Sequence, residues 1–176
     1  MHYNNYTRFK ESTAEDYNKK RISAMNSLKM QLEWVKRQLE YITFQEEFEP
    51  IMDLKKGEIY EFDFGVNVNC EFSHRHYGLV LADSHPGNPL VTVVPLKTNR
   101  FGANKNSDVN LGILDELVSA KETLAVINQI RTLDKMRMYV RPIINRNDNN
   151  ALRLLSLDKT KMDEVDKAIC EYYKLK

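Results

Sequence analysis

The stretch that decides the fold is KGEIYEFDFG, residues 56–65. Within it, the aromatic residues Tyr60, Phe62 and Phe64 alternate with two acidic ones, and a glycine follows. An alternation with a period of two places one set of side chains on each face of a β-strand. The stretch therefore predicts a strand that buries its aromatic face in a core and ends in a turn.

Further strands are predicted on the C-terminal side of this one. Their apolar or alternating runs are separated by Gly-, Pro- and Asn-containing segments, and Pro95 predicts an edge or a bulge late in one of them. The predicted strands cover residues 76–82, 90–96, 124–130 and 137–140. The polar, Asn-rich segment 99–110 is predicted to be a mobile loop, and an apolar repeat of three and four residues predicts a final helix from Asp158.

Before Pro50 the pattern is helical, and no Gly or Pro lies between Glu11 and Glu49. Apolar residues recur there at spacings of three and four, which is the seam of a heptad repeat: Met25, Leu28, Leu32, Val35, Leu39 and Ile42. Because the seam is short for a free-standing coiled coil, it has to pack against either the strand region or a second copy of itself. We therefore predict a helical N-terminal extension (residues 1–50) and a strand-rich domain with a C-terminal helix (residues 51–176), an α+β fold that is mostly β.

Composition excludes several classes of protein. Apolar residues make up 42% of the chain and charged residues 29%, which is typical of a globular protein and not of a disordered one. We find no run of about 18 apolar residues and no signal-peptide layout, and Cys70 and Cys170 lack a metal-like spacing. These features predict a cytoplasmic protein without membrane association. The net charge is +1, but residues 131–153 carry an excess of basic residues that can contact phosphates or simply face solvent.

Four blocks of the sequence resemble the MazF/PemK toxins of type II toxin–antitoxin systems. Residues 56–64 are similar to the opening strand of that family, R-G-D/E-I-W/Y-x-V-D-x. Residues 65–81 resemble its first loop and second strand, VPLKT (94–98) resembles V-x-P-L-T-S, and NQIRTLDK (128–135) resembles D/E-Q-I-R-T-I-D-K. The blocks occur in the family's order and span about residues 54–157.

The resemblance implies a small antiparallel SH3-like barrel of the CcdB/MazF/PemK type that forms a homodimer. It also implies an endoribonuclease that cuts single-stranded RNA without a metal or another cofactor. The implied protein partner is a cognate antitoxin, whose disordered tail covers the RNA groove.

The residues themselves must supply the chemistry of metal-free RNA cleavage. That reaction needs a group that takes the proton of the 2′-OH, a group that protonates the leaving 5′ oxygen, and cations around the phosphate. His74, Arg75 and His76 supply two imidazoles and a permanent cation. In an extended segment, His74 and His76 point to one side and Arg75 to the other.

The site residues follow from the matched positions. The family's catalytic Arg matches His76, with Arg75 one place earlier, and the family's Thr matches Lys97, with a hydroxyl kept at Thr98. The predicted catalytic residues are His76, Arg75, Thr98 and the loop glutamate Glu71. The predicted RNA-binding residues are Lys97, His74, Arg100, Lys105, Asn128, Gln129 and Arg131.

Simpler interpretations remain open at this stage. A His-x-His pair can decorate a strand end, and no third ligand is spaced for a metal site, so we predict none. Arg131 can pair with Asp134 instead of RNA. Residues 99–106 combine two cations, an aromatic residue and a glycine, which suits single-stranded RNA but also an ordinary surface loop.

Two functional alternatives also remain. The departures at His76, Lys97 and Asn128 favour a non-catalytic barrel that binds RNA or poisons a DNA-processing enzyme. The N-terminal helix can serve dimerisation, or its acidic end, residues 45–49, can lie over a basic groove as an inhibitor.

Overall fold

The computed structural model describes residues 14–44, 52–68, 70–114, 117, 121–139 and 155–175. Its residues form two compact units: one contains the first helix, and the other contains all the strands and the second helix. The boundary predicted at Pro50 and the acidic segment 45–49 lie outside the described residues, so the predicted division at that position stays a prediction. The basic residues Arg141, Arg146 and Arg153 also lie outside the described residues, so their predicted contact with phosphates stays a prediction.

The first unit is the helix α1, Ala14–Phe44, which is uninterrupted over 31 residues, as the absence of Gly and Pro predicts. The apolar seam on this helix is exposed: each of its six residues, from Met25 to Ile42, is between 49% and 70% accessible. Tyr17 and Ile22 are exposed as well. The helix is therefore stabilised by its own hydrogen bonds and by pairs such as Lys19–Glu15, and it presents an apolar stripe.

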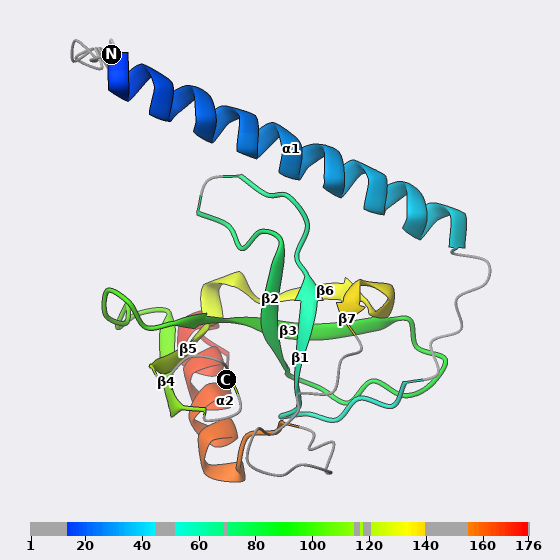
Figure 1. Cartoon of the computed structure of the whole chain (residues 1–176). Coiled ribbons are helices and arrows are strands. Elements are labelled where there is room, and N and C mark those ends of the chain that lie inside the picture. Colours follow the sequence, from blue (N-terminus) through cyan, green and yellow to red (C-terminus); the bar gives the residue numbers. More distant parts are fainter. Residues whose placement is uncertain are drawn as a thin grey trace, which may run out of the picture. The chain divides into compact units, whose positions relative to one another are not determined.

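The second unit is a bent seven-stranded sheet in which every pair of strands is antiparallel (Figure 1). The strand order is β4-β5-β3-β2-β1-β7, and β6 also pairs with β3. The strands are β1 (Ile59–Asp63), β2 (Arg75–Val80), β3 (Leu90–Thr98), β4 (Asp108–Ile113), β5 (Glu122–Val126), β6 (Arg131–Asp134) and β7 (Met138–Tyr139).

The long strand β3 joins the parts of this sheet. It pairs with β6 up to Val93 and with β5 from Leu96, and the 3₁₀ turn η1 (Ile127–Gln129) separates the two partners. Pro95 lies in this interval and has no N–H to donate to a neighbouring strand. The prediction of an edge or a bulge at Pro95 is wrong: β3 is a central strand, its described pairings keep a regular register, and Pro95 lies where β3 changes partner from β6 to β5.

The core has two clusters of buried side chains. One gathers around Phe62 and Phe64, which are 0% and 2% exposed, with Tyr60 packed against it, as the alternation predicts. The other lies under α2 and includes Leu79 and Val165. The aromatic face of β1 therefore forms core.

Gly78 on β2 allows one close contact in the first cluster. A Cβ atom at this position would lie 2.9 Å from the ring of Phe62. The absence of a side chain at Gly78 therefore lets β2 and the Phe62 ring approach.

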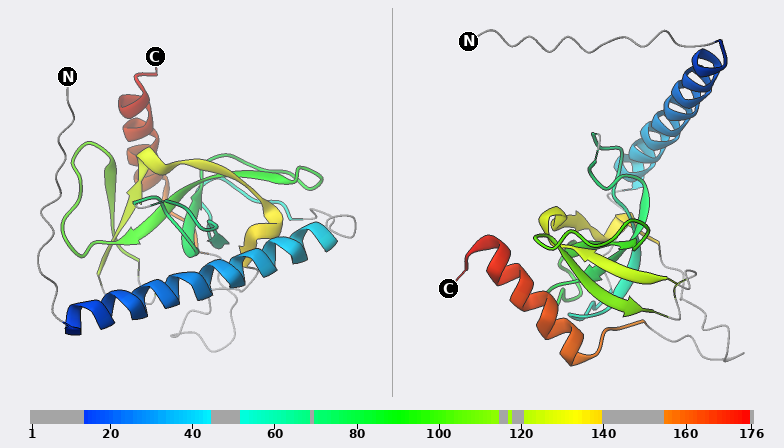
Figure 2. Two further views of the ribbon diagram at one scale, coloured as in Figure 1. Left: turned by 90° about the horizontal axis from the view of Figure 1, so that it is seen from above. Right: turned by 90° about the vertical axis from the view of Figure 1, so that its left-hand side faces the viewer.

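The C-terminal helix α2, Lys159–Tyr173, begins where the apolar repeat predicts it. The Asp158 carboxylate accepts a hydrogen bond from the Lys161 N–H, which caps the first turn. Met162 and Val165 face the core, and the helix lies against β4 and η1 (Figure 2). No helix of the described residues is long and apolar enough to cross a membrane.

Three further expectations about elements are wrong. The predicted loop 99–110 ends in β4, which begins at Asp108 and pairs with β5. The apolar run 124–130 is not one strand, because η1 interrupts it. His74 is not extended but left-handed, with φ of 64°, because hydrogen bonds with Phe64 and Gly65 close the β1–β2 loop at this residue.

Candidate functional site

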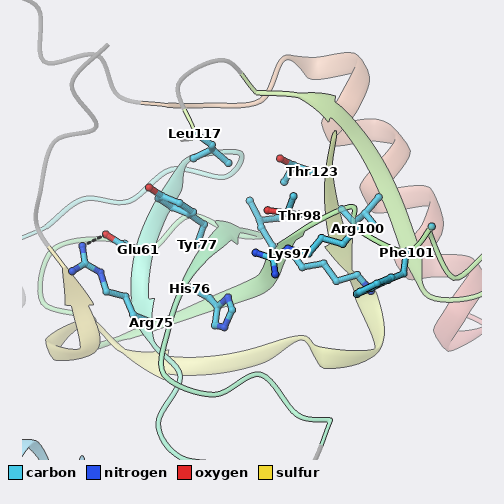
Figure 3. Close-up of a pocket in the computed structure, with 13 residues that line it drawn as sticks. Glu61, Arg75, His76, Tyr77, Lys97, Thr98, Arg100, Phe101, Leu117 and Thr123 are labelled. Atoms are coloured by element: carbon cyan, nitrogen blue, oxygen red, sulfur yellow. Dashed lines mark hydrogen bonds and ion pairs between the residues drawn. The ribbon is translucent and has the colours of Figure 1, made fainter. Parts of the chain in front are cut away.

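A pocket of about 560 Å³ lies where β2 and β3 separate (Figure 3). The two strands pair only as far as Gly78 and Pro95, while β3 continues to Thr98 beside β5. Side chains from both faces of β2 can therefore border the pocket between the two separated strands. The pocket is lined by Glu61, Arg75, His76, Tyr77, Leu96, Lys97, Thr98, Arg100, Phe101, Gly102, Leu117, Thr123 and Leu124.

Five residues selected from the sequence line this pocket. Arg75 and His76 come from β2, Lys97 and Thr98 come from the end of β3, and Arg100 follows in the next turn. The structure thus brings together two sequence blocks that are more than 20 residues apart.

His76 lies half-buried among aromatic side chains. Its ring centroid is 4.9 Å from that of Phe72 and 6.3 Å from that of Phe64, both in edge-on contacts. Burial lowers the pKa of His76 below its usual 6.5, the nearby His74 lowers it further, and a hydrogen bond with the Ser73 backbone opposes them. The imidazole is therefore neutral at neutral pH, which suits a proton acceptor better than a phosphate clamp.

Arg75 is held on the other side of β2. Its guanidinium donates to the Glu61 carboxylate on β1 and lies over the Tyr139 ring, 4.3 Å from the centroid. The hydrogen bond with Glu61 raises the pKa of Arg75, so the charge is permanent. A guanidinium has five N–H groups, so one carboxylate does not use all its donors.

Lys97 is also paired. Its ammonium lies 2.7 Å from Oδ2 of Asp108, whose side chain is only 1% exposed. The same carboxylate accepts from the Asn104 N–H and the Ser107 hydroxyl. Asp108 therefore fixes both Lys97 and the loop between β3 and β4.

Several pocket residues were not selected from the sequence. Glu61 could have been found as a polar member of the alternating strand β1, and Phe101 as the aromatic residue of a polar loop. Burial raises the pKa of Tyr77, so its hydroxyl keeps its proton at neutral pH and can donate a hydrogen bond. No signal in the sequence marks Thr123 as a neighbour of Thr98, because only their pairing across β3 and β5 brings them together.

The other six selected residues, Glu71, His74, Lys105, Asn128, Gln129 and Arg131, are not among the described residues that line the pocket. Glu71 is exposed in the β1–β2 loop, and Asn128 is exposed in η1. His74 closes that loop, and Lys105 borders a second hollow of about 260 Å³ beside α2. Their catalytic and RNA-binding roles stay predictions.

Gln129 holds the β1–β2 loop in place. Its side-chain oxygen accepts from the Phe72 N–H at 2.7 Å, and its amide nitrogen donates to the Cys70 carbonyl at 3.0 Å. Because Phe72 packs on His76, Gln129 supports the histidine from a distant part of the chain.

Arg131 and Lys135, which follow Gln129 in the sequence, make contacts within the chain. Arg131 lies over the Phe64 ring at 5.6 Å, and the Asp134 carboxylate accepts from the Met136 N–H. Lys135 is 3% exposed and donates to three backbone carbonyls, those of Met52, Ser84 and His85. Lys135 therefore stabilises the barrel and does not face a phosphate.

Within the described residues, no three His, Cys, Asp or Glu side chains are grouped so that they could hold a metal ion. The pocket instead offers an imidazole, hydroxyls, an ammonium and guanidinium groups. These are groups that exchange protons and contact phosphate oxygens.

The chain is similar to several solved structures. An endoribonuclease bound to its cognate antitoxin, from a mycobacterial species, is 18% identical, with 70% of this chain and 97% of that chain covered and a TM-score of 0.46. The Mycobacterium tuberculosis toxin MazF-mt6 is 15% identical, with 68% and 98% covered and a TM-score of 0.47. MazF from Deinococcus radiodurans is 16% identical, with 70% and 99% covered and a TM-score of 0.48. A search of the curated proteins finds no match.

The family assignment comes from the sequence. A family model described as "PemK-like, MazF-like toxin of type II toxin-antitoxin system" matches residues 55–173, well over half of the chain. The match contains all the described strands and the whole of α2, and it confirms the resemblance and the predicted type of fold. The chain belongs to the family of PemK-like, MazF-like toxins of type II toxin–antitoxin systems.

Proposed function

We propose that this toxin is an endoribonuclease that cuts single-stranded RNA in the cytoplasm without a metal ion. One observation carries the proposal beyond family membership: Arg75, His76, Lys97 and Thr98 line the same pocket. The sequence blocks that supply them were matched to the family independently of each other. A phosphate bound there can contact His76, Lys97 and Thr98, while Arg75 borders the pocket from the other side of β2, where it pairs with Glu61.

The proposed reaction uses the 2′-OH of the RNA as its nucleophile. His76 accepts the 2′-OH proton while the 2′ oxygen forms a bond to phosphorus and the bond from phosphorus to the 5′ oxygen breaks. The Lys97 ammonium donates a proton to the departing 5′ oxygen. Arg100 and the Thr98 hydroxyl contact the phosphate oxygens. The products are a 2′,3′-cyclic phosphate and a free 5′-OH.

One observation favours the second candidate, a non-catalytic barrel that binds RNA or poisons a DNA-processing enzyme. Arg75 and Lys97 are already paired with Glu61 and Asp108, so part of their charge is compensated within the chain. A substrate phosphate has to share these cations with the carboxylates.

Incubation of the purified protein with an unstructured RNA, with and without EDTA, separates the two candidates. We expect cutting in both conditions and products with cyclic phosphate ends. Intact RNA with folded protein in both conditions would reject the nuclease, and recovery of a stable protein target in a pull-down would then favour the second candidate.

A matched pair of histidine variants connects any cutting to the pocket. His76→Asn removes the proposed proton acceptor, and we expect a loss of at least about 100-fold in rate, as is typical of general-base removal. His85→Asn changes an exposed histidine in the turn before β3 and serves as the control. Equal activity of the two variants would exclude cleavage at His76.

We further propose two protein partners. The first is a cognate antitoxin, by analogy with the solved endoribonuclease–antitoxin complex from a mycobacterial species and the MazE-MazF structures from Deinococcus radiodurans. A small acidic protein encoded in the neighbouring reading frame is the candidate, and its co-expression should relieve toxicity. The second is another copy of this chain, in a homodimer assisted by the exposed seam of α1.

A further inference from the structure

The turn at Arg100, Phe101 and Gly102 forms part of the pocket wall (Figure 3). Phe101 is 100% exposed, so its ring packs on none of the residues that the structure describes. A single exposed apolar side chain is common on protein surfaces and has no meaning alone. The position of this ring, beside the cations of a pocket, is what requires an explanation.

The turn that carries Phe101 is fixed at its start. The Asn99 side chain accepts a hydrogen bond from the Gly102 N–H at 2.9 Å, and Gly102 adopts the positive φ of 91° that the turn requires. Asn99 in turn is bound to Glu122 on β5, through its backbone N–H and its side-chain amide. Hydrogen bonds from Asn99 and Asn110 lower the pKa of Glu122, so this anchor stays ionised.

The same loop is fixed at its other end. The Asp108 carboxylate accepts from the Asn104 N–H at 2.9 Å and pairs with Lys97. The exposed ring is therefore carried by a loop whose two ends are fastened to β5 and to β3. Because the loop is anchored, its backbone loses less conformational entropy when the ring binds a flat ligand.

We propose that Phe101 stacks on an unpaired nucleobase of a single-stranded RNA bound in the pocket. This inference rests on the proposed function, because the stacked base is the one next to the phosphate that His76 and Lys97 contact. Every base has a π-face, so an aromatic ring beside cations is the arrangement by which proteins bind unpaired strands. Arg100 contacts a phosphate next to the stacked base.

The chemistry around the ring favours a base over an apolar peptide. Lys97 and Thr98 line the pocket beside it, and Arg100 precedes it in the chain. An apolar side chain of a protein partner would leave these polar groups without a match, whereas a nucleotide matches the ring with its base and the cations with its phosphate.

Binding to an uncleavable RNA tests the proposal without requiring catalysis. The RNA carries a 2′-deoxy sugar at each nucleotide that could be cut, and 2-aminopurine replaces one base at a time. We expect Phe101→Leu to weaken binding by roughly tenfold or more, because a lost stack typically has an effect of this size. Phe101→Trp should keep the affinity. When 2-aminopurine occupies the stacked position, the wild type and Phe101→Trp should quench its fluorescence, and Phe101→Leu should not.

Two further variants identify the cause of any change. Tyr172→Leu removes an exposed aromatic residue of α2 outside the pocket and should bind as the wild type does. Because Phe101→Leu removes no charge, it should leave the salt dependence of binding unchanged. Arg100→Gln should lower the slope of log affinity against log salt by about 0.7, the value for one phosphate contact on a single strand.

The outcomes separate this proposal from the nuclease proposal. Equal RNA affinity of Phe101→Leu and the wild type overturns the stacking, and if Phe101→Leu then weakens binding of the antitoxin, the ring is a protein-docking residue instead. Wild-type protein that binds RNA through Phe101 but never cuts it supports the stacking and rejects the nuclease. Because the Phe101 side chain is fully exposed and packs on no described residue, a folding defect does not obscure these readouts.

Discussion

At the scale of single residues, the environment of His76 determines how the reaction should depend on pH. Burial holds the pKa of His76 below 6.5. The neutral form accepts the proton, so activity is lost as the pH falls through this pKa. We expect the acid limb of the kcat/KM profile to have its midpoint below pH 6.5 and to be retained in His85→Asn. A midpoint above 6.5 would contradict the role of a buried imidazole.

The same shift affects stability. Between the folded pKa of His76 and 6.5, the unfolded chain binds the proton and the folded chain does not, so stability rises with pH across this window. Above pH 6.5 this contribution is constant. Acidification below 6.5 therefore weakens the fold, and it does so less in His76→Asn.

The pair of Lys97 and Asp108 should be asymmetric in its effect on stability. Lys97→Met leaves a nearly inaccessible carboxylate without its cation, and we expect a loss of about 1–3 kcal/mol in the free energy of unfolding in urea. The double variant Lys97→Met/Asp108→Asn should recover most of this loss, because the buried charge is then absent. Lys105→Met, at an exposed lysine of the same loop, is the control and should stay within about 0.5 kcal/mol of the wild type. Equal losses in Lys97→Met and Lys105→Met would refute the pairing.

At the scale of elements, the contact between β1 and β2 depends on the absence of a side chain at Gly78. A methyl group there would lie 2.9 Å from the Phe62 ring, inside van der Waals contact, so Gly78→Ala should destabilise the fold by about 1–3 kcal/mol. Phe62→Leu shortens the opposing side chain, and the double variant should lose less stability than the sum of the two single ones. Strict additivity in thermal or urea unfolding would mean that the two positions do not touch.

The seam of α1 should control self-association. Six exposed apolar residues in a heptad pattern bury their surface most simply against the same seam of a second copy. We expect Leu32→Glu/Leu39→Glu to reduce the molar mass measured by light scattering, at concentrations where the wild type is at least dimeric. Ser27→Glu, off the seam on the same helix, should have no such effect. An unchanged mass in the seam variant would exclude α1 as a dimerisation element.

At the scale of the whole molecule, the relation between the N-terminal extension and the barrel can be tested by deletion. Removal of residues 1–50 should leave activity unchanged or lower if the extension serves dimerisation, since the pocket is built from residues 61–124. A rise in toxicity on expression would instead support the inhibitory alternative for the acidic segment 45–49. Growth curves at matched protein levels distinguish the two.

Much of the architecture could be predicted because it depends on local patterns. The alternation at Phe62 and Phe64 predicts β1, and the repeats of three and four residues predict both helices. The edge strand β4 was missed because its Asp, Asn and Gly residues resemble a loop, and only pairing with β5 makes it a strand. The break at η1 cannot be seen in an apolar run.

The site could be predicted only in part. The matched blocks identify His76 and Lys97, but not the carboxylates that pair with the cations. Glu61 and Arg75 are 14 residues apart and meet only because β1 and β2 pair. Electrostatic partners of this kind depend on the tertiary structure, and no local pattern indicates them.

The two hydrogen bonds of the Gln129 side chain limit which residues can replace it. Its carboxamide oxygen accepts one hydrogen bond and its nitrogen donates another, and both contacts join η1 to the loop that carries Phe72. A glutamate here would turn the donor into a second acceptor and repel the Cys70 carbonyl, and a leucine would offer neither. We therefore expect the effect of a substitution at position 129 to depend on hydrogen-bond polarity more than on size, although Gln129 is not among the described residues that line the pocket.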